Sequence, residues 1–385
     1  MPEAVIVDAI RTPIGRAFKG SLKDVRADEL AAVPLKALQE RNPEVDFGQT
    51  DDLYMGAASG IGEQGYNVAR NALLLSGIDH HVPAATVNRF CASSLQTMRM
   101  AYHAVAAGEG DQYIAAGVEA VSRAGLGAGI PDEVKNPKLD GSEGSLFDVY
   151  IPMGLTAENV AERCRVSREA QDEWAVTSQN RAVDAQQSGH FDAEITPVET
   201  PGGTMTKDDG PRPGTTMEVL GDLEPAFKED GTVTAGNSCP LNDGAAAVLI
   251  MSADRAEQLG VTPKARIIAA SAAAIRPEIM GLGPIPAVEK VLRQAGMTMD
   301  NIDVVELNEA FAAQVVPCRE EWGIDADRLN PFGGAIALGH PFGMTGARIM
   351  TTLLNDLGTL DKTIGLETMC VAGGMGQAMI VERLN

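Results

Sequence analysis

Short apolar runs alternate with amphipathic stretches along the first third of this chain. The runs are rich in β-branched and small apolar residues, and they predict strands over residues 5–10, 51–59, 85–90 and 112–120. Apolar residues at helical spacing predict helices over residues 27–40 and 69–77 and through the stretch that holds Leu95, Met98, Tyr102 and Val105. Pro34 would kink the first helix unless it falls in the first turn. This alternation predicts an α/β fold.

The last third of the chain repeats this order. Strands are expected over residues 264–274, 301–308, 363–370 and 376–384, with helices over residues 285–296 and 347–358. The middle of the chain does not show this alternation of strands and helices, because it holds glycine–proline clusters and a helical stretch at 167–187. A predicted strand at 243–252 then resumes the alternation. We therefore expect one half at 1–119 plus 241–260, an inserted domain at 120–240 and a second half at 261–385.

Composition limits the possible functions. The net charge of −22 over 385 residues disfavours nucleic acid as a partner, and no apolar run approaches the ~20 residues of a membrane span. The first residues lack the pattern of a signal peptide, and the last ones are no peroxisomal address. Five cysteines without C-x-x-C spacing favour a reducing, cytoplasmic setting, and with only five histidines they make a structural zinc site unexpected.

Three reactive side chains lie in segments rich in glycine and small residues: Cys91, His340 and Cys370. Cys91 follows a predicted strand and precedes a predicted helix, whose N-terminal N–H groups and partial positive charge would stabilise a thiolate. Taken singly, each residue has an ordinary alternative: an inert buried cysteine, a histidine in a surface turn, or a structural cysteine. Together they are the residue types needed for acyl transfer through a thioester.

Six segments in order carry a resemblance to the thiolase family: VNRFCASS, MGLTAENVA, TVTAGNSCPLNDGAAA, NEAFA, GGAIALGHPFGMTGAR and CVAGGMG. The likeness covers essentially the whole chain. The amino-acid sequences around Cys91 and at 279–290 are most similar to bacterial 3-ketoacyl-CoA thiolases of fatty-acid β-oxidation. The resemblance implies two similar βαβαβαββ halves in an α–β–α–β–α layered sandwich, with a loop domain inserted in the first half.

The resemblance also implies a role for each catalytic candidate. Cys91 would be the nucleophile that becomes acylated, and His340 the base that activates it. Cys370 would move the proton on carbon. Asn308 would hold a water that forms one oxyanion hole with His340, and the backbone N–H groups of Cys91 and Ala372 would form a second. The family commonly has glycine at the position of Ala372; the N–H survives the change, but alanine disfavours a positive φ.

Three further positions are implied to contact the substrate. Arg212 aligns with an arginine near the CoA nucleotide, and Met153 with a residue that lines the acyl pocket. Cys239 stands where many thiolases have a serine that touches the pantetheine arm, and a thiol can still make a weak hydrogen bond there. Ordinary surface exposure for Arg212 and core packing for Met153 are the alternatives.

The expected reaction is thiolytic cleavage of 3-ketoacyl-CoA in fatty-acid β-oxidation, with CoA as cosubstrate and no metal or redox cofactor. One alternative is the formation of acetoacetyl-CoA. A ketoacyl synthase is another, but such enzymes lack a second catalytic cysteine such as Cys370. A non-catalytic lipid- or CoA-binding protein on the same scaffold is the third. The family assembles as dimers or tetramers, and its β-oxidation members dock onto a hydratase–dehydrogenase subunit, so both kinds of partner are expected.

Overall fold

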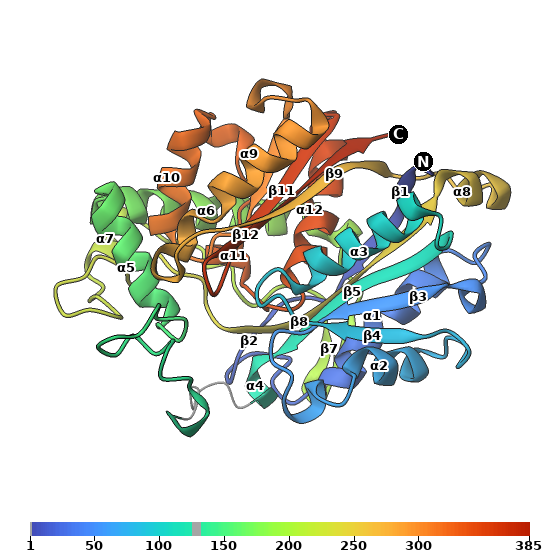
Figure 1. Ribbon diagram of the computed structural model, residues 1–385, viewed down its shortest axis with the longest axis horizontal. Coiled ribbons are helices and arrows are strands. Elements are labelled where there is room, and N and C mark those ends of the chain that lie inside the picture. The colour runs from blue at the N-terminus through green and yellow to red at the C-terminus, as the bar shows by residue number, and fades with distance from the viewer. Residues whose placement is uncertain (1, 125–131) are drawn as a thin grey trace.

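The computed structural model describes residues 2–124 and 132–385, and within them ten strands form one mixed sheet (Figure 1). The strand order is β4-β3-β5-β8-β1-β9-β12-β11-β10, with the short β2 paired to β8. The strands are β1 (Ala4–Arg11), β2 (Gly15–Arg16), β3 (Asp52–Gly56), β4 (Ala84–Val87), β5 (Gln112–Ala120), β8 (Asn242–Ser252), β9 (Ala265–Ala274), β10 (Val304–Leu307), β11 (Ile364–Val371) and β12 (Met375–Arg383). A separate hairpin pairs β6 (Val198–Thr200) with β7 (Gly203–Met205).

Four strands of each half are arranged alike, and the first half has β4 as an additional edge strand. In the first half, β3 is parallel to β4 and β5, whereas β8 runs antiparallel to β5 and β1. In the second half, β10 is parallel to β11, whereas β12 runs antiparallel to β11 and β9. The halves meet where β1 and β9 pair through Val5 with Arg266 and Ile6 with Ala265. The predicted similarity of the two halves is therefore confirmed.

Helices divide the halves into layers. Those of eight residues or more are α1 (Ala27–Arg41), α2 (Val68–Ser76), α3 (Ser93–Ala107), α5 (Met153–Cys164), α6 (Arg168–Ser188), α9 (Pro284–Ala295), α10 (Ala312–Trp322) and α12 (Thr345–Thr359). The shorter ones are α4 (Val121–Ala124), α7 (Met217–Gly221), α8 (Ala253–Leu259) and α11 (Ala335–Leu338). One apolar cluster joins α3 and α12 to strands of both halves, so these two helices form the central layer. Two further clusters place α1 and α2 outside the first half, and α9 and α10 outside the second.

Strand β8 shows why the strands read as continuous apolar runs. Val248 and Ile250 belong to the cluster around the central helices, whereas Ala247 and Leu249 pack toward α1 and α2. Because both faces of the strand are covered, no polar alternation remains in its sequence. This packing confirms the predicted α–β–α–β–α sandwich.

Between β5 and β8 the chain leaves the sheet and is tied back to it by a buried cation. The guanidinium of Arg11, on β1, is fully buried and donates to Glu194 at 2.8 Å and to Asp208 at 2.8 and 3.0 Å. Asp208 also accepts a hydrogen bond from the Ile14 backbone N–H at 2.7 Å. Both carboxylates come from this excursion, so Arg11 anchors it to the first strand.

Three local expectations need correction or completion. Pro34 lies in the middle of α1, yet the helix runs from Ala27 to Arg41 as one element, because its buried face packs on the sheet. The strand expected over 85–90 ends at Val87, since Phe90 adopts a left-handed φ of 47°. Helix α10 and the β6–β7 hairpin were not anticipated. In the described part of the chain, no helix is both long and apolar enough to span a bilayer.

Candidate active site

The N-terminal ends of the two central helices lie side by side. The Ala347 N–H of α12 donates to Ser94 Oγ of α3 at 2.9 Å. A Cβ on Gly346 would lie 2.3 Å from the backbone nitrogen of Leu95, so only a glycine permits this approach. Cys91 comes just before α3 and His340 lies in the loop before α12, so the packing of these helices brings two distant segments together.

A tight turn presents Cys91. The Phe90 N–H donates to Asn88 Oδ1 at 2.8 Å, and the Arg89 N–H donates to Ser93 Oγ at 2.9 Å. Phe90 is held at a positive φ, a conformation that costs energy for a bulky residue and that often marks a functional turn. Cys91 as a whole residue remains partly exposed, although protein atoms surround its sulfur.

The free Cys91 side chain is held as a thiol, because burial opposes the thiolate stabilisation expected from the helix N-terminus. Burial of the sulfur among protein atoms raises its pKa to about 12, and the charge of Glu119 acts in the same direction. Hydrogen bonds from the backbone N–H groups of Ala372 and Cys91 lower the pKa but do not offset burial. The nucleophile therefore needs a base at the moment of attack.

This ionisation state has a measurable consequence. Below its pKa, the thiolate fraction of Cys91 rises about tenfold per pH unit, so we expect its alkylation by iodoacetamide to accelerate steadily from pH 6 to pH 9. Mass spectrometry of the modified peptide, with Cys91→Ala as the control, gives the rate at each pH. A plateau near neutral pH would contradict the assignment and indicate a preformed thiolate.

His340 is held as a neutral base. The Thr345 hydroxyl donates to the Pro341 carbonyl at 2.8 Å, so its oxygen accepts from His340 Nδ1–H at 2.6 Å. Nε2 is then unprotonated and accepts from Asn308 Nδ2 at 3.3 Å. Burial, together with the nearby Arg348 guanidinium, lowers the pKa of His340 to about 3. The imidazole is thus neutral at physiological pH, with the lone pair of Nε2 directed at Asn308.

Thr345 is expected to matter through this tautomer. In Thr345→Val the Nδ1–H loses its buried acceptor, so the imidazole no longer prefers the tautomer that leaves Nε2 free. We expect kcat to fall by about tenfold or more, a common size for loss of a group that orients a reactive imidazole. Thr345→Ser keeps the hydroxyl and is the matched control. Equal kcat values for the valine and serine variants would contradict this role.

Backbone anchors position the His340 loop. The His340 N–H donates to Asn242 Oδ1 at 3.0 Å, and a Cβ on Gly339, at φ 111°, would meet the Asn242 amide at 2.5 Å. Glu119, fully buried at the end of β5, accepts from the Gly343 N–H at 2.8 Å. It also accepts from the backbone N–H groups of Ala58 and Ser59 and from the side-chain amide of Gln64. Glu119 thereby joins the His340 loop to the first half of the fold.

Asn308 follows β10 and is completely buried. Its neighbour Glu309 accepts hydrogen bonds from Trp174 Nε1 at 3.0 Å and Ser178 Oγ at 2.6 Å, both on α6. Glu309 also accepts from Asn330 Nδ2 at 2.8 Å and from the Ile336 N–H at 3.1 Å. Within the described residues, Asn308 Oδ1 has no hydrogen-bond partner, so it remains available to a water or substrate donor.

Cys370 lies near the end of β11 in an apolar cluster with Phe311 and Met280. Burial raises its pKa well above the usual value, and the nearby thiols of Cys91, Cys318 and Cys239 act in the same direction. Cys370 is therefore a thiol, the form that can give a proton to carbon.

The turn after Cys370 brings the N–H of Ala372 to the sulfur of Cys91. The positive φ values of this turn fall on Gly373 (77°) and Gly374 (79°), not on Ala372. Alanine therefore replaces glycine here without backbone strain.

The three positions expected to contact CoA or acyl groups are placed differently. Cys239 is partly exposed, and its N–H donates to the Ala310 carbonyl at 3.1 Å. Its thiol lies near that of Cys91, so ionisation of Cys91 would raise the pKa of Cys239. Met153 packs at the edge of the apolar cluster around Cys370. Arg212 lies exposed in a loop whose backbone binds Gln179, and no contact of the described residues links it to the cysteines.

Sequence reasoning missed the residues that support the reactive groups: Glu119, Asn242, Thr345, Glu309 and Asn330. A usable signal existed for Glu119, because a lone acid at the end of the apolar run 112–120 must be satisfied by buried donors. Asn242, Thr345 and Glu309 lie inside motifs whose other members are the reactive residues, and Asn330 lies just before the motif that begins at Gly333.

Comparison with known proteins agrees with this geometry. The family model described as thiolase, N-terminal domain, matches residues 4–254, and the one described as thiolase, C-terminal domain, matches residues 261–383. The chain belongs to the thiolase family. It is therefore an acyltransferase, and the predicted family and fold are confirmed.

The relatives of this thiolase are named for different substrates. It is 47% identical to a β-ketoadipyl-CoA thiolase of Pseudomonas aeruginosa over 404 residues, covering 99% of both chains. It is 44% identical to a 3-ketoacyl-CoA thiolase of Aeromonas hydrophila over 393 residues, covering 100% of both. The crystal structure of the Bacillus anthracis acetyl-CoA acetyltransferase superimposes with a TM-score of 0.90 at 36% identity, covering 100% of this chain and 99% of that one.

Proposed function

We propose that this thiolase cleaves 3-ketoacyl-CoA with CoA, giving acetyl-CoA and an acyl-CoA two carbons shorter. The observation that supports the proposal is a pair of neighbouring protonated thiols, Cys91 and Cys370, together with a buried neutral imidazole, His340, whose Nε2 lone pair faces Asn308. Such a set supplies a nucleophile, its base and a separate acid for carbon.

In the first half-reaction, Cys91 gives its proton to His340 Nε2 as its sulfur attacks the keto carbon. The oxyanion is stabilised by donors at the site, for which the Ala372 and Cys91 N–H groups and the pair Asn308–His340 are the candidates. The Cα–Cβ bond then breaks, its electrons form the acetyl-CoA enolate, and Cys370 protonates the carbon. The acyl group remains on Cys91 as a thioester.

Before the second half-reaction, the proton that His340 took from Cys91 passes to the Cys370 thiolate, directly or through solvent. The CoA thiol then gives its proton to the neutral His340 and attacks the thioester carbon. The bond to Cys91 breaks, and the Cys91 sulfur takes that proton from His340. Every proton is accounted for without a metal or redox group, and CoA acts as cosubstrate.

An apolar acyl group, as in fatty-acid β-oxidation, is the first substrate class. Phe311, which packs edge-on against Phe227 at 6.0 Å, and Met153 give the surroundings of Cys370 an apolar character that suits hydrocarbon. Fatty acyl chains need no charged partner there.

A 3-oxoadipyl group, with a terminal carboxylate, is the second class, and one cation favours it. A Cβ on Gly374, in the turn after Cys370, would lie 2.8 Å from the carbonyl carbon of Arg276, so this arginine borders the site. Its exposed side chain lies over the ring of Phe147 at 5.4 Å and pairs with Glu278 at 3.0 Å. A guanidinium in this place can bind a substrate carboxylate.

Intact-mass measurement tests both the chemistry and the substrate class. The thiolase is exposed briefly to 3-ketooctanoyl-CoA, to 3-oxoadipyl-CoA or to acetyl-CoA, with Cys91→Ala as the control. A hexanoyl or succinyl adduct that the control lacks supports cleavage and names the preferred class. An acetyl adduct alone indicates the acetoacetyl-CoA-forming alternative. No adduct from any substrate would favour a non-catalytic binding protein.

We also propose a homodimer that forms along β4. Among the described strands, β4 pairs with β3 alone, so its other edge is open. Tyr66 is 97% exposed, and the neighbouring Asn67 donates to the Ala84 carbonyl at the start of β4 at 3.0 Å, which places Tyr66 beside this edge. Phe90, just beyond β4, is 46% exposed. An open edge flanked by aromatic residues suits a second copy of the chain.

Sedimentation velocity tests the assembly. Tyr66→Glu is expected to shift the thiolase toward monomer, because a charge would be buried against the partner. Leu384→Glu changes an equally apolar exposed residue at the C-terminus and is the control. A wild-type monomer, or equal dissociation of both variants, would contradict the β4 interface.

Co-purification of a hydratase–dehydrogenase subunit with the native protein tests the second expected partner. The five free cysteines support a cytoplasmic setting.

A further inference from the structure

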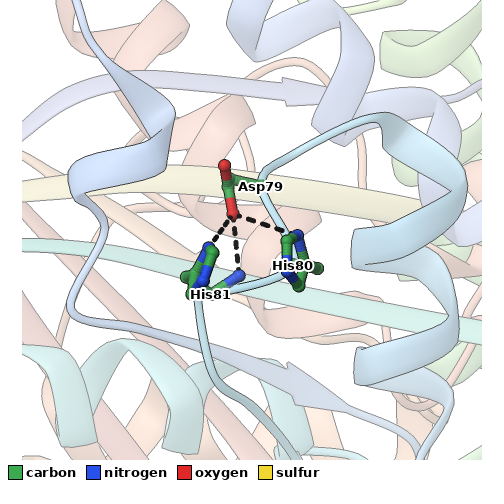
Figure 2. A group of neighbouring side chains, drawn as sticks. All are labelled: Asp79, His80 and His81. Atoms are coloured by element: carbon green, nitrogen blue, oxygen red, sulfur yellow. Dashed lines mark hydrogen bonds and ion pairs between the residues drawn. The ribbon is translucent and has the colours of Figure 1, made fainter.

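Three consecutive side chains gather at one point on the surface, in the loop between α2 and β4. Asp79, His80 and His81 each offer one ligand atom, and these atoms lie within 4.8 Å of one another. Figure 2 shows one carboxylate oxygen of Asp79 facing the rings of both histidines. All three residues are exposed, and none of them takes part in the acyl-transfer site.

The backbone beneath the cluster is fixed. Ile78 and Val82 are 4% and 1% exposed and anchor the loop at both ends. Arg70, on α2, donates to the Val82 carbonyl at 2.5 Å and to the His80 carbonyl at 2.6 Å, and the Val82 N–H donates to the Asp79 carbonyl at 3.0 Å. A ligand that binds the three side chains therefore orders their torsions without having to order the loop.

The spacing of the ligand atoms suits a small transition-metal ion. Bonds of ~2.0–2.1 Å in a tetrahedral site place neighbouring ligand atoms ~3.3 Å apart. Asp79 Oδ1 lies 3.4 Å from His80 Nδ1 and 2.7 Å from His81 Nδ1. The first distance already fits, and the second requires a small rotation of an exposed ring. The ring centroids of His80 and His81 are 4.1 Å apart, and both Nδ1 atoms contact the same oxygen of Asp79.

We propose that Asp79, His80 and His81 form a surface site for a divalent transition metal of the Zn²⁺, Ni²⁺ and Cu²⁺ class, with water at the remaining positions. Two imidazoles and one carboxylate suit this class, whereas Mg²⁺ and Ca²⁺ prefer oxygen ligands throughout. The chain's net charge of −22 favours any cation near its surface. Cysteine spacing makes a structural zinc site unexpected but does not bear on this surface site.

A metal-free arrangement competes with the bound one. Asp79 Oδ1 accepts from the His81 N–H at 2.8 Å and contacts His81 Nδ1 at 2.7 Å, so the carboxylate also closes the turn by hydrogen bonding. Metal binding exchanges the ring contact for two Nδ1–metal bonds and one carboxylate–metal bond, and the backbone hydrogen bond can persist through the other lone pairs of the carboxylate. The site therefore predicts reversible binding that depends on all three side chains.

Calorimetric titration of the full-length protein with ZnCl₂ tests the proposal, after chelator treatment and alkylation of accessible thiols to remove competing cysteine ligands. One Zn²⁺ per chain with micromolar affinity is expected. His80→Gln/His81→Gln and Asp79→Asn should each weaken it by about tenfold or more, in line with the loss of a metal-site group. His103→Gln removes an exposed histidine on α3 and should leave the affinity unchanged.

Thermal unfolding without metal accompanies each variant, so that loss of the fold is told apart from loss of ligands. Zn²⁺ binding that survives His80→Gln/His81→Gln would overturn the assignment, as would the absence of saturable binding below millimolar Zn²⁺. MgCl₂ binding as tight as ZnCl₂ binding would overturn the metal class. None of these outcomes depends on acyl transfer, so the test stands apart from that of the proposed function.

Discussion

Cys370→Ala is expected to lose carbon–carbon cleavage while it keeps acyl exchange. Cleavage needs a proton delivered to the acetyl-CoA enolate, and a positioned acid of this kind contributes about 10²–10⁴-fold to the rate. Transfer of an acyl group between Cys91 and CoA involves no proton on carbon. We therefore expect thiolysis to fall by about 10²–10⁴-fold, with exchange close to that of the wild type.

Two assays on the same preparation separate these steps. Thiolysis of 3-ketooctanoyl-CoA is followed by product formation, and exchange by transfer of the acyl group from unlabelled acyl-CoA to isotopically labelled CoA. Cys91→Ala is the reference that should lose both reactions. Parallel loss of thiolysis and exchange in Cys370→Ala would show that Cys370 supports the fold of the site and is not the acid for carbon. Unchanged thiolysis would remove it from the reaction altogether.

Arg11→Met is expected to destabilise the protein by about 3–5 kcal/mol, the usual cost of leaving buried charges without their partner. The Arg11 guanidinium is fully buried against Glu194 and Asp208. Methionine fills part of the space but offers no donor, so two carboxylates remain in the interior. Because both carboxylates belong to the excursion between β5 and β8, this segment should loosen first.

Urea unfolding followed by circular dichroism, with limited proteolysis to locate the loosened segment, measures the effect. Arg266→Met is the matched control, because Arg266 is 43% exposed in its pairs with Glu3 and Glu382, and ion pairs near the surface contribute at most about 1 kcal/mol. Similar losses for the two variants would show that the Arg11 cluster does not hold the excursion in place.

Much of the fold follows from local patterns. The strand expected over residues 5–10 is β1 (Ala4–Arg11), and the helix expected over 347–358 is α12 (Thr345–Thr359). These segments were predictable because each has a single clear period over most of its length. The boundary of β4 was not, since it depends on the left-handed turn at Phe90, which no periodicity reveals.

Identity of the reactive residues was also available from the sequence, through motifs that keep Cys91, His340 and Cys370 in order. Their protonation states were not. The position of Cys91 before a helix predicts stabilisation of its thiolate, whereas burial raises the pKa of the thiol to about 12. Burial at a site assembled from both halves of the chain is a tertiary property, and it outweighs the local field of a helix end.

The sequence by itself determined the α/β class, the repeated halves and the residue types of the site, because these depend on period, composition and motif. Only the tertiary structure decided how α3 and α12 meet and which tautomer Thr345 selects for His340. It also decided that Glu119 holds the His340 loop at Gly343 and that Glu309 holds the segment at Ile336. Those contacts join residues up to 253 positions apart. Short-range patterns carry no information on such pairs, since it is the packing of the sheet and central helices that brings them within hydrogen-bonding distance.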